Sequence, residues 1–86
     1  LARWMNDLGD GHDIIEIEMT AKHIAGKSIR ELSDEIPGGC LIAEVGRGED
    51  AHVPDADETI EYGDRITFLG DSAAVKKAVG RFHPHD

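Results

Sequence analysis

The sequence predicts a single small α+β domain, with helices packed against a mixed or antiparallel sheet, in the order strand, helix, strand, strand, strand, helix. Three observations lead to this prediction. Residues 14–19 and 65–70 alternate apolar with polar side chains, the period of two that is typical of half-buried strands. Residues 29–36 and 74–82 instead repeat apolar side chains at the spacing of one helical face. The 86 residues are enough for one domain and too few for two.

The N-terminal part is expected to connect this domain to something upstream. Residues 1–12 are interpreted as a linker and the end of an upstream helix, with residues 2–8 as its last turns and a turn at Gly9-Asp10-Gly11. The chain begins with Leu1 rather than methionine, so we expect a fragment of a longer protein. The first strand follows at 14–19, with Ile15, Ile17 and Met19 directed to the core.

The first predicted helix has the clearest start and stop signals. Ser28 and Glu31 form a capping box, in which each side chain satisfies a backbone amide at the start of a helix. Ile29, Leu32 and Ile36 then share one face, and Pro37-Gly38-Gly39 ends the helix.

The second half is expected to hold three strands and a final helix. Residues 40–45 and 51–53 are predicted strands around a glycine-rich turn, and an acidic loop leads to the strand at 65–70. The last helix begins at Asp71 or Ser72 and runs to about Val79. Residues 83–86 are expected to be a flexible tail.

The composition indicates an acidic surface over a thin aliphatic core. Eighteen acidic side chains stand against nine basic ones, which gives a net charge of −9, and only 5% of the residues are aromatic. A nucleic-acid surface needs a cationic stripe, and none is visible, so no nucleic-acid partner is expected. The acid excess fits an ordinary solvated surface, and it also fits a halophile, whose salt-rich cytosol screens repulsion between carboxylates.

Enzyme and metal chemistry find little support in the side chains. Cys40 is the only cysteine, which excludes an internal disulfide and a thiolate cage and favours a reducing intracellular setting. The Cys40 side chain itself is interpreted as a small buried hydrophobe. No apolar run approaches the roughly 20 residues that span a bilayer. The stretch ending in Lys27-Ser28 lacks the first glycine of a phosphate-binding loop, because Ala21 stands there. No nucleophile has a plausible base, so we expect no enzyme and no metal centre.

Two segments leave a ligand open. Asp55, Asp57 and Glu58 offer the oxygen ligands that calcium prefers, although a solvated acidic loop is the simpler interpretation. Arg47 lies in a glycine turn with His52 and a proline across the hairpin, where it could bind an anion or stack on a base. The residues alone favour the plainer alternative, a surface hairpin in which Arg47 pairs with Glu49 or Asp50.

Taken in order and spacing, these segments resemble the TrkA-C domain, also called RCK-C. This is the C-terminal regulatory domain of potassium channels and of Trk- and Ktr-type potassium transport proteins. The resemblance covers about residues 13–80, nearly the whole predicted fold. The motifs that carry it are Ile15-Glu16-Ile17, Gly26-Lys27-Ser28-Ile29-Arg30-Glu31-Leu32, Ile42-Ala43-Glu44-Val45-Gly46-Arg47-Gly48, Val53-Pro54-Asp55-Ala56-Asp57 and Tyr62-Gly63-Asp64-Arg65-Ile66-Thr67-Phe68-Leu69-Gly70.

The resemblance implies a regulatory domain at residues 13–82 that dimerises and senses a ligand. Such domains usually follow a Rossmann-like domain, which would bind any NAD or ATP, and they control ion flux through a membrane-embedded cation channel or transporter from the cytoplasmic side. Some members bind cyclic di-AMP between the two domains of a dimer. Matched by motif, the ligand residues would be Arg47, His52, Val53 and Pro54.

Two alternatives remain beside this prediction. One is a purely structural dimerisation domain, in which a sheet edge or the first helix self-associates. The other is a divalent-cation sensor built from Asp55, Asp57 and Glu58.

Overall fold

The computed structural model describes residues 2–9 and 11–84, so Leu1, Asp10, His85 and Asp86, which fall in the predicted linker, turn and tail, lie outside the described residues. The elements, in chain order, are β1 (Ala2–Gly9), β2 (His12–Glu18), β3 (Lys27–Ser28), the 3₁₀ helix η1 (Ser33–Glu35), β4 (Cys40–Arg47), β5 (Asp50–His52), β6 (Thr59–Ile60), β7 (Arg65–Asp71) and α1 (Ser72–Phe82).

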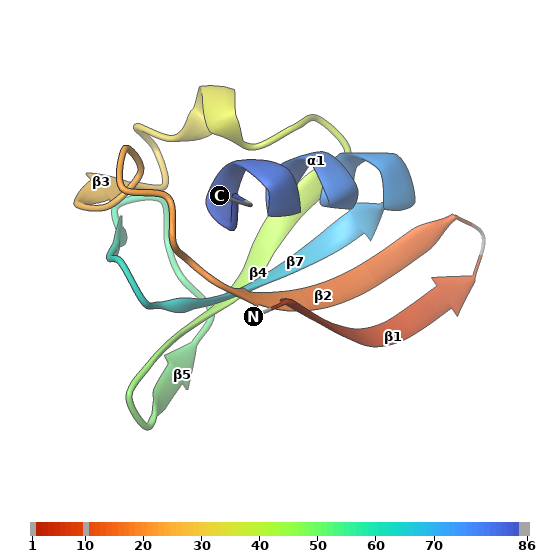
Figure 1. Cartoon of the computed structure of the whole chain (residues 1–86), viewed down its shortest axis with the longest axis horizontal. Coiled ribbons are helices and arrows are strands. Elements are labelled where there is room, and N and C mark those ends of the chain that lie inside the picture. Colours follow the sequence, from red (N-terminus) through yellow and green to blue (C-terminus); the bar gives the residue numbers. More distant parts are fainter. Residues whose placement is uncertain (1, 10, 85–86) are drawn as a thin grey trace.

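An antiparallel sheet in the order β1-β2-β7-β4-β5 forms the centre of the described fold, with β1 and β5 at its edges (Figure 1). Strand β7 pairs with β2 on one side and with β4 on the other. Phe68 of β7, for example, lies opposite Ile15 and also opposite Ile42. The predicted α+β class is confirmed, and the sheet is antiparallel.

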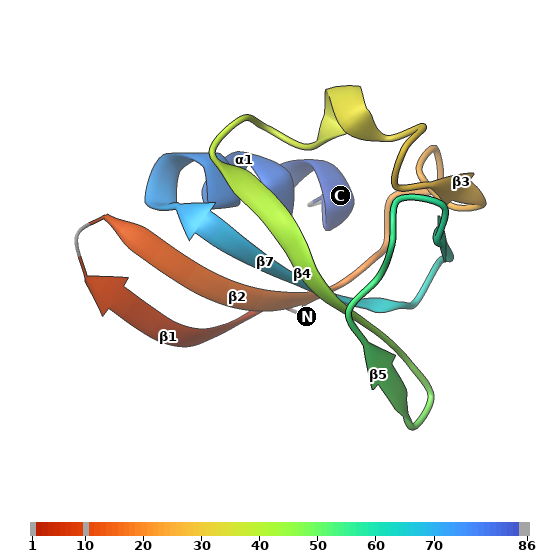
Figure 2. The same cartoon turned by 180° about the vertical axis from the view of Figure 1, so that it is seen from behind.

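Helix α1 covers one face of this sheet, as both views of the ribbon show (Figures 1 and 2). Its side chains Val75, Ala78 and Phe82 are fully buried. The ring of Phe82 meets Phe68 edge to face, with the ring centroids 5.1 Å apart. Edge-to-face pairs of this kind are favourable beyond the area they bury, so this contact fixes α1 over the middle of the sheet.

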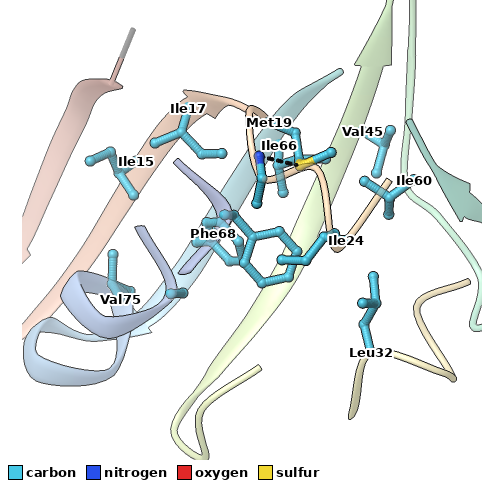
Figure 3. Close-up of a cluster of buried hydrophobic side chains, with 13 residues drawn as sticks. Ile15, Ile17, Met19, Ile24, Leu32, Val45, Ile60, Ile66, Phe68 and Val75 are labelled. Atoms are coloured by element: carbon cyan, nitrogen blue, oxygen red, sulfur yellow. Dashed lines mark hydrogen bonds between the residues drawn. The ribbon is translucent and has the colours of Figure 1, made fainter. Parts of the chain in front are cut away.

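The core continues past the end of the sheet into the segment between β2 and β4 and onto the short strand β6 (Figure 3). Met19, Ile24, Leu32 and Ile60 are fully buried there. The short antiparallel pair β3–β6 closes this end, with Lys27 opposite Ile60. Burying an aliphatic side chain contributes about 1.5–3 kcal/mol, so this second cluster is a substantial part of a small core.

The segment at 28–36 is not the α-helix that the capping box predicts. The box itself is present: the Ser28 amide donates to Glu31 Oε1 at 2.9 Å, and the Glu31 amide donates to Ser28 Oγ at 3.1 Å. Beyond a single turn, however, the chain tightens into the three-residue η1, and Ile36 is already extended. Pro37 favours that extended conformation in the residue before it, so a helix could extend no further than Glu35.

The N-terminal segment also differs from its prediction as the end of a helix. It is strand β1, which pairs antiparallel with β2, so that Trp4 lies opposite Ile15. An unpaired sheet edge offers a row of backbone donors and acceptors, and the β1 backbone satisfies those of β2. The predicted order of elements is therefore wrong at these two places.

The two-residue strands β3 and β6 were not predicted. The remaining elements follow their predictions closely. The expected strands correspond to β2, β4, β5 and β7, and the final helix corresponds to α1, which extends to Phe82. Immediately after α1, His83 Nδ1 donates to the carbonyl of Glu18 at 2.6 Å. In the described part of the chain, no helix is both long and apolar enough to cross a membrane.

Candidate functional site

The β4–β5 hairpin brings Arg47 and His52 onto one face. Val45 lies opposite His52, and Arg47 lies opposite Asp50. Opposed residues share a face, and so do alternate residues of a strand. Arg47, Asp50 and His52 therefore project on the same side as Val45, which is buried.

Gly46 makes room for a second arginine beneath this hairpin. A Cβ atom at Gly46 would lie 2.6 Å from Nη2 of Arg65. Arg65 comes from β7, crosses the glycine, and donates from Nη2 to the carbonyl of Gly48 at 2.8 Å. Gly48 has a φ of +59°, which favours glycine at the turn. The two glycines thus allow a tight turn that Arg65 braces from the neighbouring strand.

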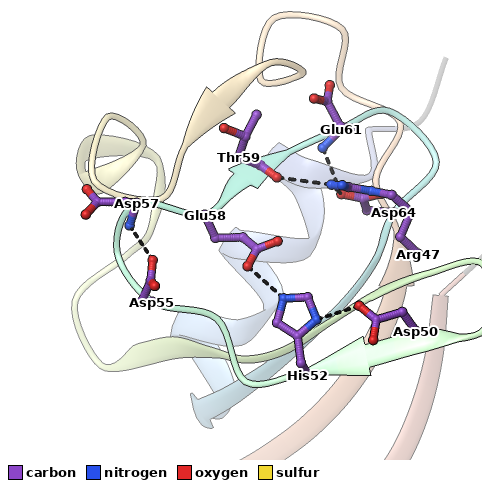
Figure 4. A network of polar contacts seen from close by, with 9 residues as sticks. All are labelled: Arg47, Asp50, His52, Asp55, Asp57, Glu58, Thr59, Glu61 and Asp64. Atoms are coloured by element: carbon purple, nitrogen blue, oxygen red, sulfur yellow. Dashed lines mark hydrogen bonds and ion pairs between the residues drawn. The ribbon is translucent and has the colours of Figure 1, made fainter.

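Arg47 itself is held by a carboxylate inside the fold (Figure 4). Its Nε donates to Asp64 Oδ1 at 2.8 Å and its Nη2 to Asp64 Oδ2 at 2.7 Å, while Nη2 also donates to the carbonyl of Thr59 at 3.1 Å. Asp64 is 2% exposed, whereas the Arg47 side chain is 52% exposed. The pair therefore joins a buried anchor to a side chain that reaches solvent.

The protonation states of this pair follow from its geometry. Burial opposes ionisation of Asp64, but the hydrogen bonds from Arg47 and from the amide of Glu61 outweigh it, so the pKa of Asp64 lies below its ordinary value. The hydrogen bonds to Asp64 raise the pKa of Arg47 further. Both groups are therefore charged at neutral pH.

One end of the Arg47 guanidinium remains available. A guanidinium carries five N–H donors, and three of them, on Nε and Nη2, are engaged by Asp64 and Thr59. Among the side chains that the structure describes, none accepts from Nη1. Arg47 is thus fixed in orientation, and its half-exposed side chain leaves the two N–H groups on Nη1 for another acceptor.

His52 lies between two carboxylates. Its Nδ1 is 2.9 Å from Asp50 Oδ2, and its Nε2 is 2.7 Å from Glu58 Oε1. The hydrogen bond to Glu58, and after it the bond to Asp50, raises the pKa of His52 above its ordinary value. Beyond His52, Val53 is 79% exposed and Pro54 is half-buried. The structure therefore places all four predicted ligand residues on one hairpin and the loop that follows it.

The acidic loop does not gather its carboxylates around one point. Asp55 accepts from the amide of Asp57 at 2.9 Å, Asp57 pairs with Arg30 at 3.1 Å, and Glu58 is bound to His52. In the part of the chain that the structure describes, no group of three or more histidine, cysteine or acidic side chains could hold a metal ion. The divalent-sensor alternative gains no support from this geometry.

The expected partner of Arg47 needs correction. The plainer interpretation paired Arg47 with Glu49 or Asp50, but the partner is Asp64, 17 residues away. The sequence analysis missed Asp64, although its place just before an apolar strand was a usable signal.

Cys40 is half-buried, and burial raises the pKa of its thiol, as fits a packing role.

The fold and the hairpin define a small accessory domain, whose polar side chains bind one another rather than surround a reacting atom. The sequence model of the TrkA-C domain matches residues 14–83, and the chain belongs to this family. It is accordingly a non-catalytic regulatory domain, of the RCK-C type found in Trk and Ktr potassium transport proteins and in potassium channels.

One relative by sequence is the Trk system potassium uptake protein TrkA homolog of Archaeoglobus fulgidus, which is 26% identical over 68 residues. The match takes in 79% of this chain but only 15% of the relative. The chain therefore spans about a seventh of the length of that protein.

Two solved structures with the same fold contain cyclic di-AMP. The RCK C domain of the potassium transport protein KtrA, in complex with cyclic di-AMP, is 28% identical with a TM-score of 0.68, over 81% of this chain and 82% of that one. The RCK_C dimer of S. agalactiae BusR, in complex with cyclic di-AMP, is 30% identical with a TM-score of 0.69, over 81% and 95%. BusR has also been solved with its busA-promotor DNA, at 26% identity and a TM-score of 0.70, over 93% of this chain and 41% of that one.

Proposed function

We propose that this chain is the ligand-sensing and dimerisation domain of a protein that controls the transport of potassium or another cation. The ligand would be cyclic di-AMP, bound between two copies of the domain by Arg47, His52, Val53 and Pro54. The observation that carries the proposal is the half-exposed side chain of Arg47, whose Nε and Nη2 are fixed by Asp64 and whose Nη1 is left for a ligand.

The chemistry of the hairpin suits a cyclic dinucleotide. The two N–H groups on Nη1 can donate to phosphodiester oxygens, and an arginine that is already oriented loses little entropy on binding. The exposed side chain of Val53 and the ring of Pro54 supply apolar surface for an adenine. The KtrA and BusR relatives, at 28% and 30% identity, support this choice of ligand, because both were solved with it.

His52 would contribute charge rather than a hydrogen bond. Both ring nitrogens are already engaged by Asp50 and Glu58. As an imidazolium it offsets part of the negative charge of those carboxylates, which would otherwise repel a phosphate at Arg47. The acidic surroundings make the protonation of His52 important for any anion that binds here.

In the whole protein, we place this domain in the cytoplasm at the inner face of the membrane. A Rossmann-like domain would precede residues 13–82, and a membrane-embedded channel or transporter would be the partner. A ligand that binds one dimer arrangement more tightly would shift the population towards it and change ion flux. With a net charge of −9, this domain itself is a poor nucleic-acid surface, and the BusR–DNA complex contains additional protein, since this chain matches only 41% of it.

A purely structural dimerisation domain is the second candidate. Strands β1 and β5 are the sheet edges in the described fold, and an edge strand can pair with a second copy. Such a domain would dimerise without any response to nucleotides.

The test is thermal unfolding of the 86-residue chain in KCl with cyclic di-AMP, with ATP and calcium as parallel controls. Cyclic di-AMP at 100 times its dissociation constant should stabilise the fold by about 2.7 kcal/mol. Arg47→Lys should abolish the shift, because lysine keeps a cation beside Asp64 but lacks Nη1. Arg30→Lys, at an arginine that pairs with exposed Asp57, is the matched control. A dimer that ignores all three additives, or full binding by Arg47→Lys, would contradict the proposal.

A further inference from the structure

The two contacts of His52 cannot both be hydrogen bonds when the ring is neutral. Asp50 Oδ2 faces Nδ1 at 2.9 Å and Glu58 Oε1 faces Nε2 at 2.7 Å. A neutral imidazole has one N–H, so either tautomer points a lone pair at a carboxylate oxygen. Only the imidazolium satisfies both contacts.

The contact with Glu58 joins two separate parts of the chain. Asp50 and His52 belong to β5, whereas Glu58 belongs to the loop that follows it. That loop is bound to the 28–32 segment, because the amide of Ile29 donates to the carbonyl of Glu58 at 3.0 Å and the amide of Arg30 to that of Ala56 at 2.8 Å. A charged His52 therefore ties the hairpin to a loop that is anchored in the second core cluster.

The charged groups around His52 come from its own strand and from three neighbouring elements. Asp50 faces it from β5 and Glu58 from the loop. Arg47, on β4, acts on Glu58 through its charge, and Arg65, on β7, donates to the carbonyl of Gly48 at the tip of the hairpin. With His52 charged, it and its two carboxylates sum to −1, and loss of its proton leaves −2 beside Arg47.

We propose that the proton on His52 is a second input to this hairpin: the imidazolium closes β5 onto the 55–58 loop and favours binding of an anion at Arg47. Loss of the proton opens this link and leaves Asp50 and Glu58 uncompensated. The effect on the ligand rests on the proposed function, whereas the closure depends only on contacts within the chain.

The direction with pH follows from linkage. The pKa of His52 is raised in the folded domain, so the stability it adds is complete below the unfolded value of about 6.5 and is lost as pH rises through the raised pKa. If the ligand requires this proton, its dissociation constant should increase by up to about tenfold per pH unit above that pKa.

The first measurement is an NMR pH titration of the ligand-free chain. We expect the His52 ring to titrate above 6.5, and the amide signals of Ala56, Asp57 and Glu58 to shift with the same midpoint. Glu58→Gln should lower that midpoint. Titration of His52 at or below its ordinary value, or loop signals that ignore it, would overturn the closure.

The second measurement is the dissociation constant of cyclic di-AMP between pH 6 and pH 9. The pH dependence of the dissociation constant should disappear in His52→Gln. It should persist in the control variant His12→Gln, because His12 lies at the start of β2 and faces Asp71. Affinity that is flat with pH in the parent chain would overturn the coupling. Failure of the parent chain to bind at any pH would contradict the proposed function, while the ligand-free titration would still decide the closure.

Discussion

At the scale of single residues, Arg47 and Asp64 show how an exposed side chain can be oriented by a buried one. An exposed ion pair contributes little, because water solvates both charges and the side chains lose entropy. Asp64 differs, since it is buried and accepts from the backbone as well as from Arg47. Removing one partner of such a pair leaves the charge of the other partner without an opposite charge beside it, which destabilises the fold.

We predict that Asp64→Asn lowers the free energy of unfolding by about 2–3 kcal/mol, because a buried amide cannot accept both Arg47 bonds. Denaturant unfolding at pH 7 measures this loss. Asp57→Asn, at the exposed pair with Arg30, is the control and should change stability by less than about 0.5 kcal/mol. Because the folded pKa of Asp64 is depressed, its contribution should persist above about pH 4 and fade as pH falls through that lowered pKa. Equal losses in the two variants would contradict this account.

At the scale of elements, strand β7 is the most constrained part of the sheet. It is paired on both sides, and its penultimate residue, Gly70, lies opposite both Asp13 and Cys40. A Cβ atom at Gly70 would lie 2.5 Å from Cα of Cys40 and would also meet the carbonyl oxygen of Gly39. These are backbone atoms of β4 and the turn before it, so they cannot move aside as a flexible side chain can.

Two glycine-to-alanine variants should therefore act in opposite directions. Gly70→Ala should destabilise the domain by about 1–3 kcal/mol through overpacking between β7 and β4. Gly80→Ala, at an exposed position of α1 with open space around it, should stabilise by about 0.5–1 kcal/mol, since alanine favours the helix. Melting temperatures of both variants test this directly. A stable Gly70→Ala would mean that β4 can shift away from β7.

The segment at 28–36 shows what a local signal does and does not determine. Ser28 and Glu31 make both predicted capping hydrogen bonds, so the local chemistry was predictable. Whether a helix follows depends on length and surroundings. Here Pro37 ends the segment, and burial of Leu32 in the second core cluster holds the chain in a turn and a short 3₁₀ helix.

At the scale of the whole molecule, the charge of −9 on 86 residues is the dominant feature. Repulsion among like charges favours the expanded unfolded chain and is screened when the Debye length falls from about 10 Å at 0.1 M salt to about 3 Å at 1 M. We predict that the melting temperature rises by several degrees between 0.1 M and 1 M KCl. Glu44→Gln and Glu49→Gln together, at two exposed acids, should reduce this rise. A melting temperature that is flat or falling with KCl would show that local ion pairs outweigh the net charge.

The sequence by itself determined strands β2, β4, β5 and β7 and the final helix, because burial on one face imposes a period of two on a strand and of 3.6 on a helix. It also placed Arg47 and His52 on one hairpin, since a glycine turn between two short apolar runs has few other solutions. Local patterns of this kind depend only on neighbouring residues.

Only the tertiary structure decided what Arg47 and His52 bind. Asp64 is 17 residues from Arg47, and Glu58 comes from a loop whose path depends on the 28–32 segment. In a chain with eighteen acids, the sequence offers many candidate partners and no local rule to choose among them. Packing decides which acid pairs with Arg47, because burying Asp64 just before β7 is favourable only where a cation can reach it. The same holds for β1, which became a strand because β2 had an edge to pair.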